Sequence, residues 1–258
     1  MNPNNKNSHF LDKILSFNIG RQQAMKENVE IINKAYNFAK DYHSKDTSGH
    51  DFEHIKRVYA NVCSLLNTKN TQTGCDEFIV KMSAILHDVD DRKLNTDGKN
   101  TLRFLESINL EKAKIEQILS TINSTSFSKS GCNPQFETNE MKILSDADKL
   151  DAIGAIGICR AIMFGVSKNR SLFDENIFPK SNLTKEEYKN LSRDENNTIN
   201  HFFDKLLKLK NAMQTDAGKN EAQRRHVFMV DFLKQFFKEQ NLENWQEYLE
   251  NYLCEGKV

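Results

Sequence analysis

The chain has 258 residues, in which 36 Lys and Arg balance 36 Asp and Glu. A chain of this length can bury a substantial core, and its balanced charge excludes a general attraction to nucleic acid or to a membrane surface. Residues 1–9 are polar and Asn-rich, and no run of about 18 apolar residues occurs, so neither a secretory signal nor a membrane span is expected. Five widely spaced cysteines without a Cys-x-x-Cys pair are typical of reduced thiols. We therefore expect a soluble cytoplasmic protein with a frayed start.

Only three prolines occur, and the apolar residues recur at helical spacing, which predicts an all-α fold. In chain order, helices are expected near residues 22–43, 52–66, 78–86, 99–108, 111–123, 138–164, 196–213, 217–240 and 242–253.

We interpret residues 1–258 as one helical domain, with a core at about 20–165, a polar excursion at 166–197 and C-terminal helices at 198–253. Loops as long as this excursion are often functional, so it is a candidate lid over a substrate. Beyond it, His201 and two nearby lysines are expected on the exposed face of their helix.

The segment from Phe52 to Leu66 carries an apolar stripe with His54 and Arg57 beside it. His50 precedes His54 by four residues and would share its face if the helix began that early. This position suggests a phosphate-binding or ligand-supporting role for His50, and a capping residue is the alternative.

The apolar segment 78–86 is followed directly by His87 and Asp88, and then by turn-forming residues. The His-Asp pair is therefore expected at the C-terminus of a helix. Taken alone, such a pair is more often a cap and a surface polar group than a metal ligand.

The apolar block 143–160 carries three carboxylates, which are costly to bury unless they are paired or coordinated. Asp146 is expected on a solvated face. Asp148 and Asp151, three residues apart, can share a face, so that one could bind a metal while the other orients a ligand or a lysine.

Two imidazoles and two carboxylates can hold one divalent cation and leave positions open for water and substrate. The candidate ligands are His54, His87, Asp88 and Asp148. Mixed nitrogen and oxygen ligands suit Mn²⁺, Fe²⁺, Co²⁺, Ni²⁺ or Zn²⁺ better than Mg²⁺. Such a cation acidifies water and polarises a phosphoryl oxygen, so hydrolysis of a phosphate ester is its natural use.

Cationic side chains near the metal would bind the remaining phosphate oxygens. The candidates that adjoin the predicted ligands in sequence are Arg57, Arg92 and Lys149.

Several motifs point the same way when they are taken together. They are Ser48-Gly49-His50-Asp51 with His54 and Arg57-Val58, the His87-Asp88 pair, the segments 146–158 and 201–207, and Arg225-His226-Val227-Phe228-Met229. Over about residues 20–240 the chain resembles the HD-domain superfamily of metal-dependent phosphohydrolases, and within it a bacterial subgroup of small stand-alone HD hydrolases. The resemblance implies an HD-domain helical bundle with one buried metal site and a C-terminal helical extension. It implies His54, His87, Asp88 and Asp148 as the ligands.

The resulting hypothesis is a phosphohydrolase that acts on a small phosphorylated metabolite, with a nucleotide as the favoured class, through a metal-activated water. Asp88, Asp91 and Asp151 are the candidate proton acceptors. A non-catalytic nucleotide- or metal-binding regulatory module is the alternative, and a homo-oligomer is possible. A diiron oxygenase is disfavoured, because only His50 lies plausibly close to the two predicted histidine ligands.

Overall fold

The computed structural model describes residues 4–44, 51–68, 74–90, 97–125, 136–179 and 197–254, with side chains from residue 22 onward. Every regular element in these ranges is a helix, which confirms the predicted all-α fold. The elements are α1 (Asn4–His43), α2 (Phe52–Leu66), α3 (Glu77–Leu86), α4 (Asn100–Ser107), α5 (Lys112–Thr125), α6 (Asn139–Asp151), α7 (Gly154–Ser167), α9 (Asn200–Asp204), the 3₁₀ helix η3 (Leu206–Ala212), α10 (Asp216–Glu239) and α11 (Glu243–Cys254).

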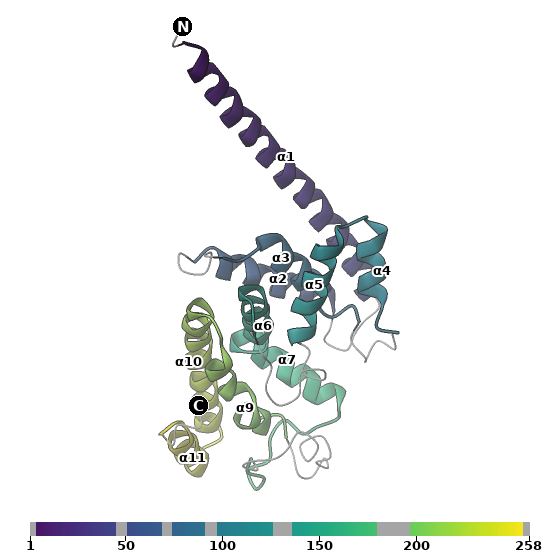
Figure 1. Cartoon of the computed structure of the whole chain (residues 1–258). Coiled ribbons are helices and arrows are strands. Elements are labelled where there is room, and N and C mark those ends of the chain that lie inside the picture. The colour runs from purple at the N-terminus through teal and green to yellow at the C-terminus, as the bar shows by residue number, and fades with distance from the viewer. Residues whose placement is uncertain are drawn as a thin grey trace.

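Helix α1 begins much earlier than predicted, at Asn4 rather than near residue 22, so the expectation of a frayed start was wrong. No proline occurs between Pro3 and the end of this helix, so no residue there lacks the backbone N–H that a helix requires. Figure 1 shows that α1 projects far from the other helices and carries the N-terminus at its outer end. Its C-terminal part packs on the rest of the chain through the buried side chains of Ala35 and Ala39.

The core consists of two clusters of buried apolar side chains. The smaller cluster joins the end of α1 to α3, α4 and α5, with Met82, Ile85 and Leu105 fully buried. The larger one joins α2, α6 and α7 to the C-terminal helices and is rich in aromatic rings around the buried Trp245. Helices α2, α3 and α6 pack against one another between these two clusters (Figure 1).

The helix predicted over residues 138–164 is divided in two, because the chain turns after Asp151 and α6 and α7 meet at a bend of 64°. Gly154 lies at the turn with φ +77°, a left-handed conformation that glycine adopts without steric cost. Arg225 of α10 donates a hydrogen bond to the carbonyl oxygen of Leu150 over 2.5 Å and thereby satisfies one of the last acceptors of α6. The bend places Asp151 at the end of one helix and near the start of the next.

The helix predicted over residues 196–213 is also divided, into α9 and η3, at Lys205, whose φ of −138° and ψ of −57° are not helical. The other predicted helices agree with the structure to within a few residues.

The described part of the polar excursion packs onto the C-terminal helices. Phe178 stacks on Trp245 with ring centroids 4.3 Å apart, and the indole N–H of Trp245 donates to the carbonyl oxygen of Glu175 over 3.0 Å. Residues 168–179 are therefore held in place by α11. Residues 180–196 lie outside the described residues, so the predicted lid stays a prediction.

No single described helix is both long and apolar enough to cross a membrane, and only the bent pair α6 and α7 reaches the required length and composition when the two are taken together. The cysteines that the structure describes, Cys63, Cys75, Cys159 and Cys254, are free thiols, as predicted. Cys132 lies outside the described residues.

Candidate metal centre

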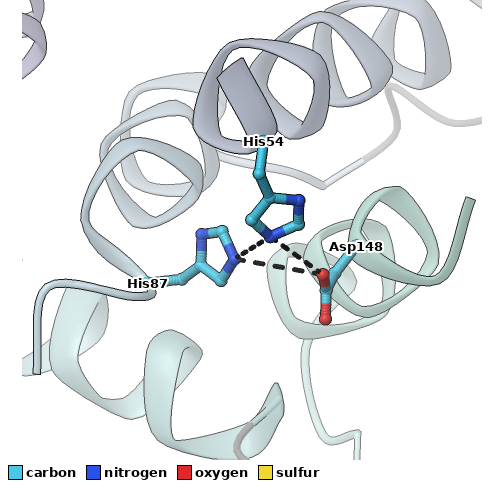
Figure 2. A group of neighbouring side chains, drawn as sticks. All are labelled: His54, His87 and Asp148. Atoms are coloured by element: carbon cyan, nitrogen blue, oxygen red, sulfur yellow. Dashed lines mark hydrogen bonds and ion pairs between the residues drawn. The ribbon is translucent and has the colours of Figure 1, made fainter. Parts of the chain in front are cut away.

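Three helices bring the predicted ligands together. His54 lies in the first turn of α2, where the carboxylate of Asp51 caps the helix by accepting the His54 backbone N–H over 2.9 Å. His87 directly follows α3 and Asp88 comes next, while Asp148 projects from α6. Figure 2 shows the two imidazoles and the Asp148 carboxylate pointing toward one another from these three segments.

The distances between the ligand atoms fit one shared cation. His54 Nε2 lies 3.3 Å from His87 Nε2, 3.4 Å from Asp88 Oδ2 and 3.5 Å from Asp148 Oδ1. His87 Nε2 lies 3.6 Å from Asp88 Oδ1 and 4.0 Å from Asp148 Oδ1. Ligands about 2.1 Å from one ion are separated from each other by roughly 3.0 to 4.2 Å, depending on the coordination geometry. The ligand atoms of His54, His87 and Asp148 all lie within 4.8 Å of one another and therefore suit one divalent cation, while Asp88 lies beside the two imidazoles through different oxygen atoms.

In both imidazoles Nδ1 makes a hydrogen bond with the surrounding protein, so that Nε2 is the nitrogen that can bind a metal. His87 Nδ1 donates to the carbonyl oxygen of Ala84 over 2.9 Å, and His54 Nδ1 donates to Asp151 Oδ2 over 2.7 Å. When Nδ1 carries the proton, Nε2 carries a lone pair. The Nε2 atoms of both rings face the shared site, which is the arrangement expected of metal-binding histidines.

The centre is buried on the histidine side and open at Asp148. The side chain of His54 is 3% exposed, whereas that of Asp148 is 40% exposed. Burial lowers the pKa of His54, but hydrogen bonds with Asp151 and Asp88 outweigh it and raise the pKa to about 9. The centre therefore attracts positive charge, and a substrate can approach it from the Asp148 side.

The turn after the His-Asp pair is anchored on α4. The Asp90 carboxylate accepts the backbone N–H groups of Asn100 over 2.9 Å and Thr101 over 3.0 Å. Val89 is fully buried. These contacts fix the backbone that carries His87 and Asp88, as a helix cap does.

The contacts of Asp151 argue against a role as general base, which is one of its two predicted roles. Its side chain is 2% exposed and accepts hydrogen bonds from His54, Arg57 and Arg160. Burial alone would raise the pKa of Asp151, but the bonds from His54 and Arg57 hold it well below its usual range. A carboxylate so strongly stabilised in its charged form is a poor proton acceptor. Its position matches the other predicted role, orientation of a ligand.

Two of the predicted phosphate-binding residues have other partners. Arg57 donates to Asp151 through Nε, over 2.6 Å, and through Nη2, over 3.2 Å. Lys149 donates to the Ser145 hydroxyl, lies over the Phe136 ring at 5.3 Å, and has its pKa lowered by burial. Phosphate binding by Arg57 or Lys149 stays a prediction. His50, Asp91 and Arg92 lie outside the described residues, so their roles stay predictions.

The sequence prediction missed Arg160, which donates to Asp151 from α7. The signal was a single cation within an otherwise apolar and small-residue helix, and such a side chain requires a partner when it is partly buried.

Two polar residues were predicted to be exposed and are not. Asp146 is fully buried, and its carboxylate accepts the backbone N–H groups of Gln214 and Thr215, each over 2.8 Å, and the Thr215 hydroxyl over 2.7 Å. It connects α6 to the start of α10. His201 is partly buried, and burial lowers its pKa to about 3.

Comparison with known proteins gives relatives that cover most of the chain. No family model matches. The Bacillus subtilis protein YpgQ is 33% identical over 203 residues, which are 75% of this chain and 86% of YpgQ. The crystal structure of an HD-superfamily hydrolase from Bacillus thuringiensis is similar with a TM-score of 0.65 and 35% identity, over 83% of this chain and 98% of the hydrolase. The structure of YpgQ in complex with ADP has a TM-score of 0.63 and 27% identity, over 81% of this chain and 97% of YpgQ.

Proposed function

The chain belongs to the HD-superfamily hydrolases, and we propose that it hydrolyses a small phosphorylated metabolite of the nucleotide class at the site of His54, His87, Asp88 and Asp148. The observation that carries this proposal is the convergence of ligand atoms from three helices at separations of 3.3 to 4.0 Å. A nucleotide is favoured because YpgQ, which has a similar structure, was crystallised with ADP.

We infer one divalent cation per chain. Among the described residues, one group of metal-binding side chains has its ligand atoms within 4.8 Å of one another. When bound, a cation such as Mn²⁺, Fe²⁺, Co²⁺, Ni²⁺ or Zn²⁺ would supply a Lewis acid that acidifies water and polarises a phosphoryl oxygen. His54 and His87 would hold it through Nε2, and Asp148 would bind it at the open side of the centre.

Asp88 is the proposed proton acceptor among the described residues. Its two oxygens face different imidazoles, Oδ2 at 3.4 Å from His54 Nε2 and Oδ1 at 3.6 Å from His87 Nε2. The carboxylate is thus held beside the reacting centre, where it could take a proton from the attacking water. Asp91 remains the alternative proton acceptor, and His50 and Arg92 remain candidate phosphate-binding residues.

The test combines metal analysis of the purified protein with a panel of nucleoside mono-, di- and triphosphates, in which release of phosphate and of pyrophosphate is measured. Asp88→Asn and His87→Ala should remove activity. Glu77→Gln is the control, because Glu77 lies on α3, the helix that His87 directly follows, is 52% exposed and pairs only with Lys81 among the described residues. Stoichiometric metal and nucleotide binding without turnover, with every divalent ion tried, would instead support a regulatory module.

A further inference from the structure

His54 Nδ1 forms a compact triangle with one atom of Asp151 and one atom of Arg160. His54 Nδ1 lies 2.7 Å from Asp151 Oδ2 and 2.7 Å from Arg160 Nη1, and Nη1 donates to the same Oδ2 atom. A guanidinium has no acceptor atom, so the carboxylate oxygen is the one charged acceptor of the three. Both N–H groups therefore point at Asp151 Oδ2, and the Arg160 bond restrains the atom that determines the orientation of the His54 ring.

Arg57 holds the other part of the same carboxylate. It lies one turn after His54 on α2 and makes its shorter bond, 2.6 Å, to Asp151 Oδ1, while its contact with Oδ2 is 3.2 Å. Arg57 and His54 move together because they share a helix. Arg160 comes from α7, which packs on α10 and α6, and so gives Oδ2 a restraint that is independent of α2.

Three carboxylates lie around His54, and the buried one, Asp151, is paired with two arginines. Asp88 Oδ2 and Asp148 Oδ1 lie 3.4 and 3.5 Å from Nε2 of this ring, and the third carboxylate, Asp151, adjoins Nδ1. The Asp151 side chain is 2% exposed, so water does not offset its charge. Two guanidinium groups keep it ionised and fixed in place.

We propose that Arg160 is a positioning residue of the metal centre, which holds Asp151 Oδ2 in line with the Nδ1–H group of His54 so that Nε2 of this ring faces the cation. The inference rests on the proposed metal site but not on any substrate. It predicts that the loss of Arg160 weakens metal binding although Arg160 itself binds no metal.

Co²⁺ is the probe, because its visible absorption spectrum reports ligand geometry without substrate. Affinity is measured by competition with a chelator of known strength. Arg160→Met keeps much of the side-chain volume and removes the donors. It should lower the affinity for Co²⁺ by about 10- to 100-fold, the range typical of lost hydrogen bonds to metal ligands, and alter the spectrum. Arg160→Lys, which restores a cation that can donate to Oδ2, should recover most of the loss.

The control is Arg224→Met, which removes a 74% exposed arginine that also pairs with a carboxylate, that of Glu221. It should leave affinity and spectrum unchanged. If Arg160→Met does not fold, Arg160→Leu replaces it as the neutral variant without a donor. A folded neutral variant with the affinity and spectrum of the natural chain overturns the proposal. Failure of the natural chain to hydrolyse any phosphate ester would overturn the proposed function and leave this result standing, since no substrate takes part.

Discussion

His54 Nε2 lies 3.3 Å from His87 Nε2, although the two residues are 33 positions apart and their Nδ1 atoms are bonded elsewhere. Two neutral imidazoles with their lone pairs directed at each other repel. The contact is favourable when a cation lies between the lone pairs and the two nearby carboxylates, or when a proton takes its place. The geometry is therefore that of a site that requires positive charge.

Metal binding should accordingly stabilise the protein. After removal of metal by a chelator, addition of Mn²⁺, Co²⁺ or Zn²⁺ at about 100 times the dissociation constant should raise the free energy of unfolding by about 2.7 kcal/mol. Mg²⁺ should act more weakly because half of the ligand set is nitrogen. Thermal unfolding followed by circular dichroism measures the effect, and His87→Ala should abolish it. Equal stabilisation of His87→Ala and the natural chain would place the metal elsewhere.

Asp151→Asn should destabilise the metal-free protein by about 2 to 4 kcal/mol, because it leaves two partly buried guanidinium groups without their carboxylate. Asp97→Asn is the matched control: Asp97 also pairs with an arginine, Arg103, but both side chains are about half exposed. The control should cost no more than about 1 kcal/mol. Urea denaturation gives both values, and equal losses in the two variants would contradict the buried role of Asp151.

The helical fold and the proximity of His54, His87 and Asp148 could be predicted from sequence, since apolar periodicity and motif order are local signals. The bend between α6 and α7 could not. At this bend the carbonyl oxygen of Leu150 accepts a hydrogen bond from Arg225, which is 75 residues away in the sequence. The same holds for the pairing of Arg160 with Asp151 and for the burial of Asp146, because both are set by tertiary contacts between separate helices.

Asp146→Ala should be among the most destabilising substitutions in α6. The fully buried carboxylate accepts three hydrogen bonds from Gln214 and Thr215, so its loss leaves three partly buried donors without this acceptor. A loss of about 3 to 5 kcal/mol is expected in chemical denaturation. Asp216→Ala, which removes a carboxylate that is 84% exposed, should change the value by less than about 1 kcal/mol. A small effect of Asp146→Ala would show that water replaces the lost acceptor.

Gly154→Ala should destabilise the protein more than Gly98→Ala does. Both glycines have positive φ, +77° and +71°, so both substitutions incur the left-handed backbone cost of about 1 to 2 kcal/mol. At residue 154 the new Cβ would meet another side chain, Arg225 Cγ at 3.0 Å, whereas at residue 98 no atom of the described residues lies within 4 Å. The difference between the two unfolding free energies measures this contact. Identical losses would mean that Arg225 moves aside at no cost.

Stability should fall as the pH is lowered from about 6.5 to about 4, in part because of His226. Burial, and to a lesser extent the charge of Lys210, lower the pKa of this histidine to about 4, although a hydrogen bond with the backbone of Leu207 acts in the opposite direction. Between the unfolded pKa of about 6.5 and this folded pKa, the unfolded chain binds a proton that the native protein does not, so acid favours unfolding. Below about pH 4 the histidine is protonated in both states and the loss of stability stops growing.

His226→Leu removes the titrating group from a 4% exposed position and should make the unfolding free energy less dependent on pH between about 6.5 and 4. Urea denaturation of both proteins at several pH values provides the comparison, in which all other titrating groups are common to the two. Parallel pH profiles for the natural chain and the variant would show that His226 is protonated equally in the folded and unfolded states.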